Sequence, residues 1–482
     1  MEHRLDHRDG PRDECGVFGI YAPEHDVARL TYFALYALQH RGQESAGIAT
    51  AHRGANIIAI RDQGLVSQVF DDNTLRSLVG DLAIGHVRYS TTGSSEWENA
   101  QPIVRDDRRT LALAHNGNLI NAVELHAELR GADVPFRSTS DSEIIAALLA
   151  THPAQRIDEA VADVLPRLRG AFSTVVMTEE AVVAFRDPHG LRPLAIGVIE
   201  GLGGGEDSYC VASESCAFDL IGAHYLRDVE PGEVVTLSAA GLRSRRVATD
   251  QRRAFCVFEY IYFARPDSRM AGTVLQVARA RMGEILWREA PVDADVVIPV
   301  PDSGNAAARG LARAAGLPQD DGFIKNRYVT RTFIQPGQEL RRQGLRLKFN
   351  PLREVVAGQR LVVVDDSIVR GNTTRQIVQM LREAGAAEVH LRISAPPIKH
   401  PCHYGIDMST REEMIAHGRS VEEVAAEIGA DSLHYLSLAG VYEAVGAARE
   451  HHCDACFSGE YPLSGTEDAA GKYALELPLV RA

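Results

Sequence analysis

The sequence predicts two domains of different fold, an antiparallel α+β domain followed by a parallel α/β domain. Residues 15–245 consist of short β-type runs separated by Gly-rich turns, with two helical stretches among them. From about residue 254 onward, continuous apolar runs alternate with helices, which is typical of a parallel sheet covered on both faces. A chain of 482 residues also exceeds one typical hydrophobic core, so two or three domains are expected.

The spacing of apolar residues predicts the elements of the first half. Residues 15–20 and 181–185 are short apolar runs of the kind that form strands. Residues 28–40 repeat apolar side chains near a period of 3.6, which predicts a helix, and residues 142–150 predict a second one. The glycines of residues 201–205 predict a surface loop that joins two strands of a hairpin.

The second half follows a basic connector at residues 244–253. Residues 296–300, 361–364 and 388–394 are strand candidates, and the second of them leads directly into a helical pattern. Residues 327–350 are rich in Arg, Gln and Thr and have no periodicity. A loop of that length in a compact enzyme is usually functional or disordered.

Composition and charge exclude several classes of protein. The net charge of -14 and the pI near 5.7 argue against a general binder of nucleic acid or anionic membranes. No run approaches the ~18 apolar residues of a membrane span, and the polar residues 1–14 lack the apolar centre of a secretory signal. A cytoplasmic protein is expected, and its seven cysteines, an odd number, then favour catalysis or metal binding over disulfides.

Five residues of the first half together provide what is needed to bind and open an amino-acid amide. Arg88 can hold an α-carboxylate through its planar fork, and Asp141 can hold an α-ammonium. Asn116 and the N–H of Gly117 can receive an oxyanion as the thiol of Cys15 attacks. Taken singly, a cysteine in an apolar strand is more often a core residue, and an aspartate at a helix start is also compatible with a cap.

The surrounding motifs resemble the N-terminal-nucleophile glutamine amidotransferases. They are Cys-Gly-Val-Phe-Gly at 15–19, Gln-His-Arg-Gly-Gln-Glu-Ser-Ala-Gly at 39–47, Gly-His-Val-Arg-Tyr-Ser-Thr at 85–91 and His-Asn-Gly-Asn-Leu at 115–119. The resemblance implies that Met1 to Glu14 is a propeptide and that Cys15 becomes the first residue of the mature chain. Its own α-amine, with an ordinary pKa of about 7.7–8.0, would then serve as the general base. Arg41 would shape the glutamine pocket, with an ion pair that supports the fold as the alternative.

A second set of motifs lies in the α/β half. In residues 360–374 an apolar strand ends in two acids, followed by a hydroxyl-rich turn with Gly371 and then a helix. Such a helix start can hold a phosphate, and the acids can hold ribose hydroxyls directly or through Mg²⁺, although an acidic pair at a strand end can also be a solvated turn. The pattern resembles the phosphoribosyl pyrophosphate (PRPP) signature of type I phosphoribosyltransferases. The PRPP-binding residues that the resemblance implies are Asp365, Asp366, Ser367, Arg370, Gly371, Asn372, Thr373, Thr374 and Lys348.

Two further segments match this phosphoribosyltransferase pattern. Residues 299–304 resemble the pyrophosphate loop, with Ser303 as a candidate Mg²⁺ contact beside Asp365 and Asp366. Residues 325–328 and 331–336 resemble the flexible loop that closes over PRPP, and such closure excludes water from a reactive centre.

The order of the two domains resembles the amidophosphoribosyltransferase family. The organisation implied is a propeptide at 1–14, a glutaminase domain at 15–245, a phosphoribosyltransferase domain at 254–450 and a C-terminal segment at 451–482. The reaction implied is PRPP, glutamine and water giving 5-phosphoribosylamine, pyrophosphate and glutamate, with ammonia channelled between the sites, as the first step of de novo purine synthesis. Purine nucleotides are expected as feedback inhibitors and a homotetramer as the assembly. Other amidotransferases are one alternative, which the signature at 365–374 disfavours. A regulator with an inactive PRPP fold is another, which the intact Cys15 and the two acids disfavour.

Four cysteines remain as candidates for a metal site. Cys453 and Cys456 form a Cys-x-x-Cys, which alone is compatible with zinc, a redox pair or an iron–sulfur site. With Cys256 and Cys402 there are four thiolates, a number that suits a [4Fe–4S] cluster. The family resemblance implies such a cluster on these four positions, and Zn²⁺ on the same thiolates is the alternative.

Overall fold

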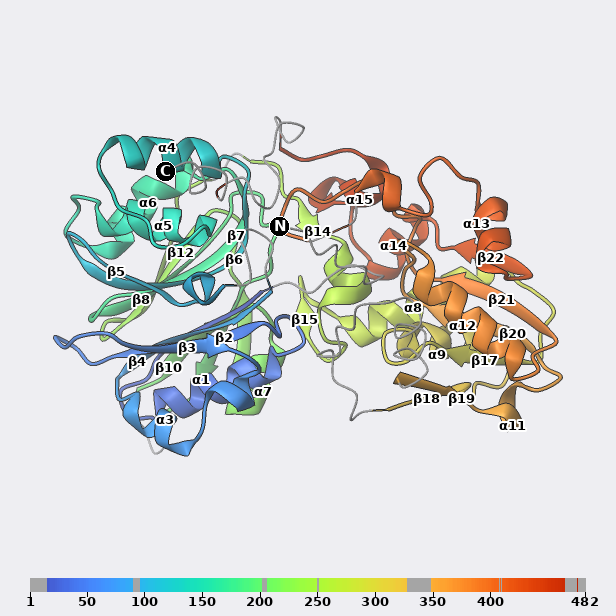
Figure 1. Cartoon of the computed structure of the whole chain (residues 1–482). Helices are drawn as coiled ribbons and strands as arrows, with labels where there is room; N and C mark the ends of the chain where they lie inside the picture. The colour runs from blue at the N-terminus through green and yellow to red at the C-terminus, as the bar shows by residue number, and fades with distance from the viewer. Residues whose placement is uncertain are drawn as a thin grey trace.

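The computed structural model describes residues 15–89, 96–201, 206–248, 251–326, 348–406, 408, 410–463 and 475. Two bodies lie side by side, the first formed by the N-terminal half and the second by the C-terminal half (Figure 1). The predicted propeptide, residues 90–93 of the Arg88 motif and residues 327–347 of the predicted loop lie outside the described residues.

The first domain contains two stacked antiparallel sheets. The seven-stranded sheet has the order β11-β9-β10-β1-β4-β2-β3 and the six-stranded sheet the order β13-β12-β8-β7-β6-β5. Between them lies an apolar layer that includes Val17, Ile84, Ala114 and Val175. The first sheet is built from β1 (Gly16–Tyr21), β2 (Ser45–Ala51), β3 (Ile58–Gln63), β4 (Leu82–Arg88), β9 (Ala195–Ile199), β10 (Ser208–Ala212) and β11 (His224–Asp228). The second is built from β5 (Ile103–Asp106), β6 (Thr110–Leu119), β7 (Gly170–Met177), β8 (Ala181–Arg186), β12 (Glu233–Ser238) and β13 (Gly241–Arg246).

Helices cover the outer face of each sheet (Figure 1). On the first sheet lie α1 (Val27–Ala37), α2 (Val66–Val69), α3 (Asp72–Ser77) and α7 (Cys216–Ile221). On the second lie α4 (Ala122–Gly131), α5 (Asp141–Ala150) and α6 (Ile157–Val164). Short 3-10 turns occur at Trp97–Asn99 and Leu165–Arg167. The predicted antiparallel α+β domain is therefore confirmed, including the hairpin of β9 and β10.

The end of α1 differs from the prediction of a helix over residues 28–40. The helix begins at Val27 because the Asp26 side chain caps the N–H of Arg29, and it ends at Ala37. Beyond that point Gln39 accepts a hydrogen bond from the N–H of Val66, and His40 lies 2.7 Å from Glu214 Oε1. Tertiary contacts thus stop a helix that the apolar period alone would continue.

The second domain is a parallel α/β sheet, as predicted. Its order is β17-β20-β21-β22, and all three neighbouring pairs are parallel. Strand β22 was not predicted, because two half-buried polar side chains alternate there with buried Leu433 and Tyr435. The strands are β17 (Val296–Pro299), β20 (Arg360–Asp365), β21 (Glu388–Ile393) and β22 (Ser432–Tyr435). The helices are α8 (Leu275–Glu289), α9 (Asn305–Ala315), α11 (Arg353–Val356), α12 (Asn372–Glu383), α13 (Val421–Ile428) and α14 (Leu438–Val445).

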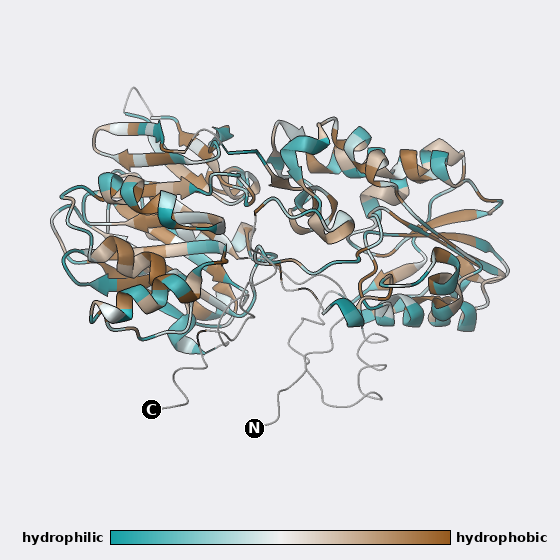
Figure 2. Cartoon of the chain, turned by 90° about the horizontal axis from the view of Figure 1, so that it is seen from above, coloured by the Kyte–Doolittle hydropathy of each residue, from teal (hydrophilic) through white to brown (hydrophobic). Residues whose placement is uncertain are grey.

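The apolar strands lie inside and the polar helix faces outside in both domains (Figure 2). An antiparallel pair, β18 (Phe323–Lys325) and β19 (Phe349–Pro351), flanks residues 327–347. Two short antiparallel strands, β15 (Arg269–Met270) and β16 (Thr273–Val274), precede α8. No helix among the described residues is both long and apolar enough to cross a bilayer.

The junction of the two domains is made by short elements from distant parts of the chain. Strand β14 (Phe255–Cys256) pairs in parallel with β23 (His452–Cys453), which brings the C-terminal segment to the start of the second domain. A π-helix at Glu259–Phe263 follows β14, and α15 (Ala455–Ser458) follows β23. Single 3-10 turns at Arg411–Glu413 and Arg449–His451 complete this region.

Candidate functional site

Four of the predicted site residues meet at one end of the sheet sandwich. Cys15 directly precedes β1, and the neighbouring strand β4 ends at Arg88. Gly16 pairs with Val87 in the antiparallel register, so Cys15 and Arg88 are the next residues opposite each other. Asn116 lies on β6 of the facing sheet, and Asp141 begins α5. All four side chains are buried, with at most 6% of their surface exposed.

The thiol of Cys15 is held in its neutral form. Its Sγ donates to the carbonyl oxygen of Tyr89 at 3.3 Å. Burial raises the pKa of Cys15 to about 11, although the hydrogen bond to Tyr89 and the charge of Arg88 oppose that rise. A thiol of this kind needs a nearby base before it can act as a nucleophile at neutral pH.

Asn116 and Gly117 are neighbours on β6, and each has a feature that is compatible with the predicted oxyanion site. The Nδ2 of Asn116 is buried and has no hydrogen-bond partner among the described residues. Such orphaned donors are rare in folded proteins and are often found where a ligand binds. Gly117 has φ of 149°, and a Cβ there would lie 1.9 Å from the carbonyl oxygen of Ala171, so only glycine fits.

Asp141 is held in place by contacts with β6, and a different residue caps α5. Its Oδ2 accepts the N–H of Leu119 at 2.9 Å, and its Oδ1 lies 3.8 Å from Nδ1 of His115. The side chain of Ser140 is the cap, since its Oγ accepts the N–H of Ser142. Asp141 therefore connects the helix start to the strand that carries Asn116.

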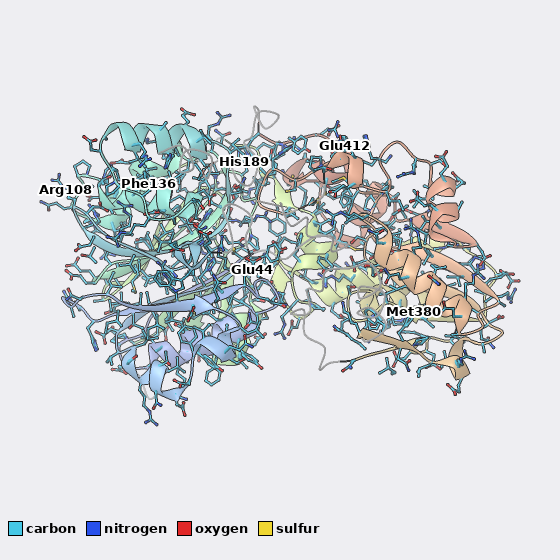
Figure 3. All side chains as sticks on the ribbon, in the orientation of Figure 1. Glu44, Arg108, Phe136, His189, Met380 and Glu412 are labelled. Carbon is cyan, nitrogen blue, oxygen red and sulfur yellow. The ribbon has the colours of Figure 1, made fainter. Side chains whose placement is uncertain are left out.

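Arg88 has an acidic neighbour that the sequence analysis did not single out. Its Nη1 lies 3.8 Å from Oε2 of Glu44. Figure 3 places Glu44 on the side of the first domain that faces the second. A Gln-Glu-Ser turn entering a strand carries no signal that would distinguish such a residue from an ordinary surface acid.

Arg41 braces the backbone of Cys15 and connects the two domains. Its Nε donates to the carbonyl oxygen of Cys15 at 3.1 Å, and its Nη groups pair with Glu214 at 2.5 Å and Glu259 at 2.8 Å. Burial opposes ionisation of Glu214, but His40 and Arg41 nevertheless hold the pKa of that carboxyl well below its ordinary value. These contacts agree with the alternative prediction for Arg41, an ion pair that supports the fold.

The acid pair of the second domain lies at the carboxyl end of β20. Asp365 ends that strand, Asp366 follows it, and both are buried. Burial raises the pKa of both carboxyls, and the neighbouring Asp366 raises that of Asp365 further. Hydrogen bonds from Ser303 and Ser367 to Asp366 counter this effect, so the pyrophosphate-loop serine meets the acid pair in space.

The turn after the acids leads into α12. Gly371 has φ of 77°, and a Cβ there would lie 2.4 Å from Cδ1 of Ile415. Arg370 donates to Oε2 of Glu413 at 3.0 Å. Asn372, Thr373 and Thr374 form the first turn of α12, whose N–H groups are suited to bind a phosphate.

Lys348 lies close to this acid pair. It precedes β19, and its charge lowers the pKa of Asp365, against the larger effect of burial. Its Nζ also lies 5.0 Å from the ring centroid of Phe349. Residues 327, 328 and 331–336 of the predicted closing loop lie outside the described residues. Lys325, at the start of that segment, pairs with Asp302.

The four candidate ligand cysteines gather at the domain junction. Cys256 and Cys453 are register partners in the β14–β23 pair, and Cys456 lies on α15. The N–H of Lys399, three residues before Cys402, donates to the carbonyl oxygen of Cys456. Burial raises the pKa of Cys453 to about 12, and the neighbouring Cys402 contributes to that rise. None of the four forms a disulfide, and the described residues contain no group of three or more His, Cys, Asp or Glu side chains placed to hold a metal ion.

The C-terminal part of the second domain also reaches β6, the strand that carries Asn116. The Nδ2 of Asn118 donates to the carbonyl oxygen of His403 at 3.0 Å. Gly405 packs against Gly117, since a Cβ on Gly405 would lie 3.0 Å from its carbonyl carbon. The residues next to Cys402 are therefore in contact with the glutaminase domain.

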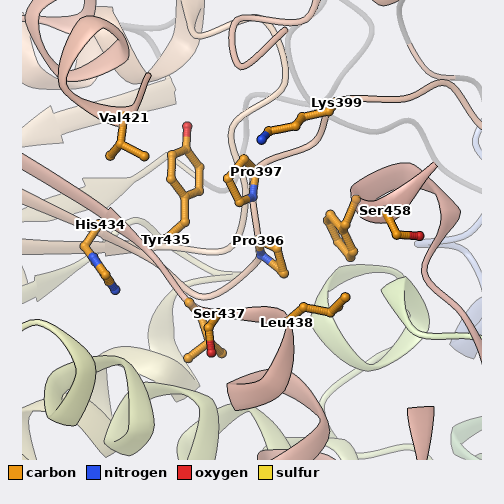
Figure 4. A pocket seen from close by; sticks show the side chains of 11 residues that line it. Pro396, Pro397, Lys399, Val421, His434, Tyr435, Ser437, Leu438 and Ser458 are labelled. Carbon is orange, nitrogen blue, oxygen red and sulfur yellow. The ribbon is translucent and has the colours of Figure 1, made fainter. Parts of the chain in front are cut away.

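A cavity of about 280 Å³ lies beyond the carboxyl ends of β21 and β22 (Figure 4). Its walls are mostly apolar and include Pro396, Tyr435, Leu438 and Phe457, with Lys399 at one side. None of the predicted site residues lines it.

Comparisons with known proteins give one matching family for each half of the chain and several relatives that match nearly its full length. Residues 86–219 match the glutamine amidotransferase domain family, and residues 275–404 match the phosphoribosyl transferase domain family. Amidophosphoribosyltransferase of Synechocystis sp. is 52% identical over 99% of this chain and 96% of its own length. That of Mycobacterium tuberculosis is 50% identical over 98% of this chain and 91% of its own length. The solved structure of glutamine PRPP amidotransferase from Bacillus subtilis with ADP and GMP covers 95% of this chain and 100% of its own, at 47% identity and a TM-score of 0.88.

Proposed function

Because the chain belongs to the amidophosphoribosyltransferase family, which aminates PRPP with glutamine in purine biosynthesis, we propose that Cys15 and the Asp365–Thr374 segment perform the two halves of that reaction. The observation that carries the proposal is the meeting of Cys15, Arg88, Asn116 and Asp141 at one buried end of the sheet sandwich.

The glutaminase half begins with glutamine bound through its α-groups. Arg88 takes the carboxylate and Asp141 the ammonium, which points the side-chain amide toward Cys15. The Sγ of Cys15 attacks the amide carbon while the free α-amine of the same residue takes the thiol proton. Asn116 Nδ2 and the N–H of Gly117 stabilise the oxyanion, and one such donor is typically worth about 10²–10³ in rate. The α-ammonium returns the proton to the departing amide nitrogen, so that ammonia leaves, and water then hydrolyses the thioester to glutamate and frees the Cys15 thiol.

Cleavage between Glu14 and Cys15 is part of this proposal. With the preceding residues attached, the nitrogen of Cys15 is an amide and cannot accept a proton. The raised pKa of the Cys15 thiol supports the need for that base. Removal of residues 1–14 would therefore switch the glutaminase on.

The synthase half takes place at the carboxyl end of β20. The N–H groups at the start of α12 hold the 5-phosphate, with Ser367, Arg370 and the threonines around it. Asp365 and Asp366 hold the ribose hydroxyls. Ammonia attacks C1 of the ribose as pyrophosphate leaves toward Lys348, which gives 5-phosphoribosylamine. Ser303 and the two acids are oxygen ligands of the kind that Mg²⁺ prefers, and Mg²⁺ would neutralise charge on the leaving pyrophosphate.

Ammonia passes between the two sites in its uncharged form, since ammonium is no nucleophile. The contacts of Asn118 with His403 and of Arg41 with Glu259 support a fixed path between the domains.

Cys256, Cys402, Cys453 and Cys456 would hold a [4Fe–4S] cluster, which would tie the C-terminal segment to the rest of the second domain. Zn²⁺ on the same four thiolates is the alternative, and the two differ in whether iron and acid-labile sulfide are bound to the protein.

Regulation and assembly are carried over from the relatives. The Bacillus subtilis enzyme was solved with ADP and GMP, so purine nucleotides are proposed as feedback inhibitors of this enzyme. A homotetramer in the cytoplasm, where seven thiols stay reduced, completes the proposal.

The test is a coupled assay on anaerobically purified protein whose N-terminus is verified as Cys15. Glutamate and pyrophosphate should appear together, with glutamate release stimulated by PRPP and Mg²⁺. Cys15→Ser should abolish the glutamine-dependent reaction and keep amination of PRPP by added ammonia. Loss of both reactions in Cys15→Ser, or glutamate without pyrophosphate in the parent, would contradict the assignment of two separate sites.

A further inference from the structure

Two buried amide side chains, Asn99 and Gln101, connect the parts of the glutamine site to one another. Asn99 exchanges two hydrogen bonds with Thr139, since its Nδ2 donates to the hydroxyl at 3.1 Å and its Oδ1 accepts the Thr139 N–H at 3.0 Å. Thr139 lies two residues before Asp141. Asn99 is 1% exposed, so these bonds form without competition from water.

Gln101 makes the second connection. Its Oε1 accepts the N–H of His115 at 2.7 Å, and its Nε2 donates to Oγ of Ser142 at 3.0 Å. The same Ser142 hydroxyl lies 3.0 Å from Nδ1 of His115, which closes a buried ring of three residues through the backbone N–H and the imidazole of His115. His115 directly precedes Asn116, and Ser142 directly follows Asp141.

We propose that Asn99 and Gln101 are positioning residues of the glutaminase, which fix the oxyanion strand and the ammonium-binding helix start relative to each other. Gln101 fixes Asn116 through the backbone of His115, and Asn99 fixes Asp141 through the residues that lead into α5. The inference rests on the proposed function of Asn116 and Asp141.

The two amides should affect different steps of catalysis. Asn116 acts as the oxyanion develops, so loosening the backbone beside it lowers kcat with little effect on glutamine binding. Asp141 holds the α-ammonium in substrate and transition state alike, so loosening the start of α5 raises KM. Misplacement of a catalytic group by about 1 Å can lower a rate by ~100-fold, so both effects are measurable.

The variants are Gln101→Met and Asn99→Leu, which keep side-chain volume and remove the amide. The matched control is Asn121→Leu in the same domain. Asn121 also exchanges two hydrogen bonds, donating to the carbonyl oxygen of Arg167 and accepting the N–H of Arg169, both at 3.0 Å. Steady-state glutaminase kinetics, ammonia-dependent amination of PRPP and thermal unfolding are measured on all three cleaved enzymes and on the parent.

Gln101→Met should lower glutamine-dependent kcat by about tenfold or more with KM within about twofold, and Asn99→Leu should raise KM by about tenfold with a smaller change in kcat. Asn121→Leu should change the unfolding temperature alone, and ammonia-dependent activity should stay at the parent value in all three. If both amide variants behave as the control does, or if all three lose activity in proportion to stability, the positioning roles are wrong. A parent enzyme with free Cys15 that releases no glutamate would overturn the proposed function as well.

Discussion

The guanidinium of Arg41 lies between the carbonyl oxygen of Cys15, at 3.1 Å, and the carboxylate of Glu259, at 2.8 Å, so a residue of the second domain braces the proposed nucleophile of the first. Arg41 and Glu259 are both fully buried at their charged ends. A buried pair of this kind is strongly destabilised when one partner is lost.

Glu259→Gln should therefore lower the free energy of unfolding by about 3 kcal/mol or more, as measured by urea denaturation. It should also reduce glutaminase activity, because the backbone of Cys15 loses part of its brace. Glu443→Gln is the control, since Glu443 pairs with Arg288 at an exposed site and should contribute less than about 1 kcal/mol. Equal effects of the two substitutions would contradict the bracing role.

The reactivity of Cys15 should depend on whether residues 1–14 are attached. In the uncleaved chain burial holds the pKa near 11, so about one thiol in a thousand is ionised at pH 8. Alkylation by iodoacetamide should then be slow at neutral pH and accelerate toward pH 11. Once Cys15 is N-terminal, its α-amine accepts the proton, and rapid alkylation should appear near pH 8. Mass spectrometry of the Cys15 peptide gives both rates, and equal rates at pH 8 would refute the activation by cleavage.

Asp365→Asn should stabilise the ligand-free protein at neutral pH while it abolishes PRPP binding. Burial and Asp366 raise the pKa of Asp365 above its unfolded value, so the ionised group disfavours the folded state at pH 7. The parent protein loses stability as the pH rises through the pKa that Asp365 has in the folded state, because the buried carboxyl then ionises. Below about pH 4 Asp365 is protonated in both the folded and the unfolded state, so Asp365→Asn should no longer be more stable than the parent.

Thermal unfolding at pH 7 and at pH 4 measures this effect. The unfolding temperature at pH 7 should rise by at least about 2 °C. Asp293→Asn is the control, because its carboxylate is 86% exposed and should leave that temperature unchanged. A lower unfolding temperature for Asp365→Asn at pH 7 would show that the acid pair is favourably ionised without its ligand.

Cys453→Ser should remove the metal centre, and Cys210→Ser should keep it. Cys453 lies beside Cys256 in the register of the β14–β23 pair, whereas Cys210 is buried in the core of the first domain. Iron and acid-labile sulfide are quantified in anaerobically purified protein, together with unfolding temperature. Stoichiometric zinc without sulfide in the parent would favour the alternative metal, and equal iron in both variants would exclude Cys453 as a ligand.

Much of the fold followed from local patterns in the sequence. The alternation of continuous apolar runs with helices predicted the parallel sheet of the second domain, because a strand buried on both faces must be apolar throughout. Strand β22 could not be found this way, since only Leu433 and Tyr435 of its four residues are buried. The end of α1 was misplaced because the partners of Gln39 and His40 lie elsewhere in the chain.

The sequence by itself determined the candidate chemistry, because each reactive segment is contiguous: Cys15 with its glycine, Asn116 with Gly117, and the acids with the turn and helix that follow them. The tertiary structure alone decided which residues brace them. Arg41 and Glu259 are 218 residues apart, and Asn99 meets Thr139 across 40 residues. Buried charges and amides take whichever partner the packed sheets bring within hydrogen-bond distance, and no local pattern in the chain encodes that choice.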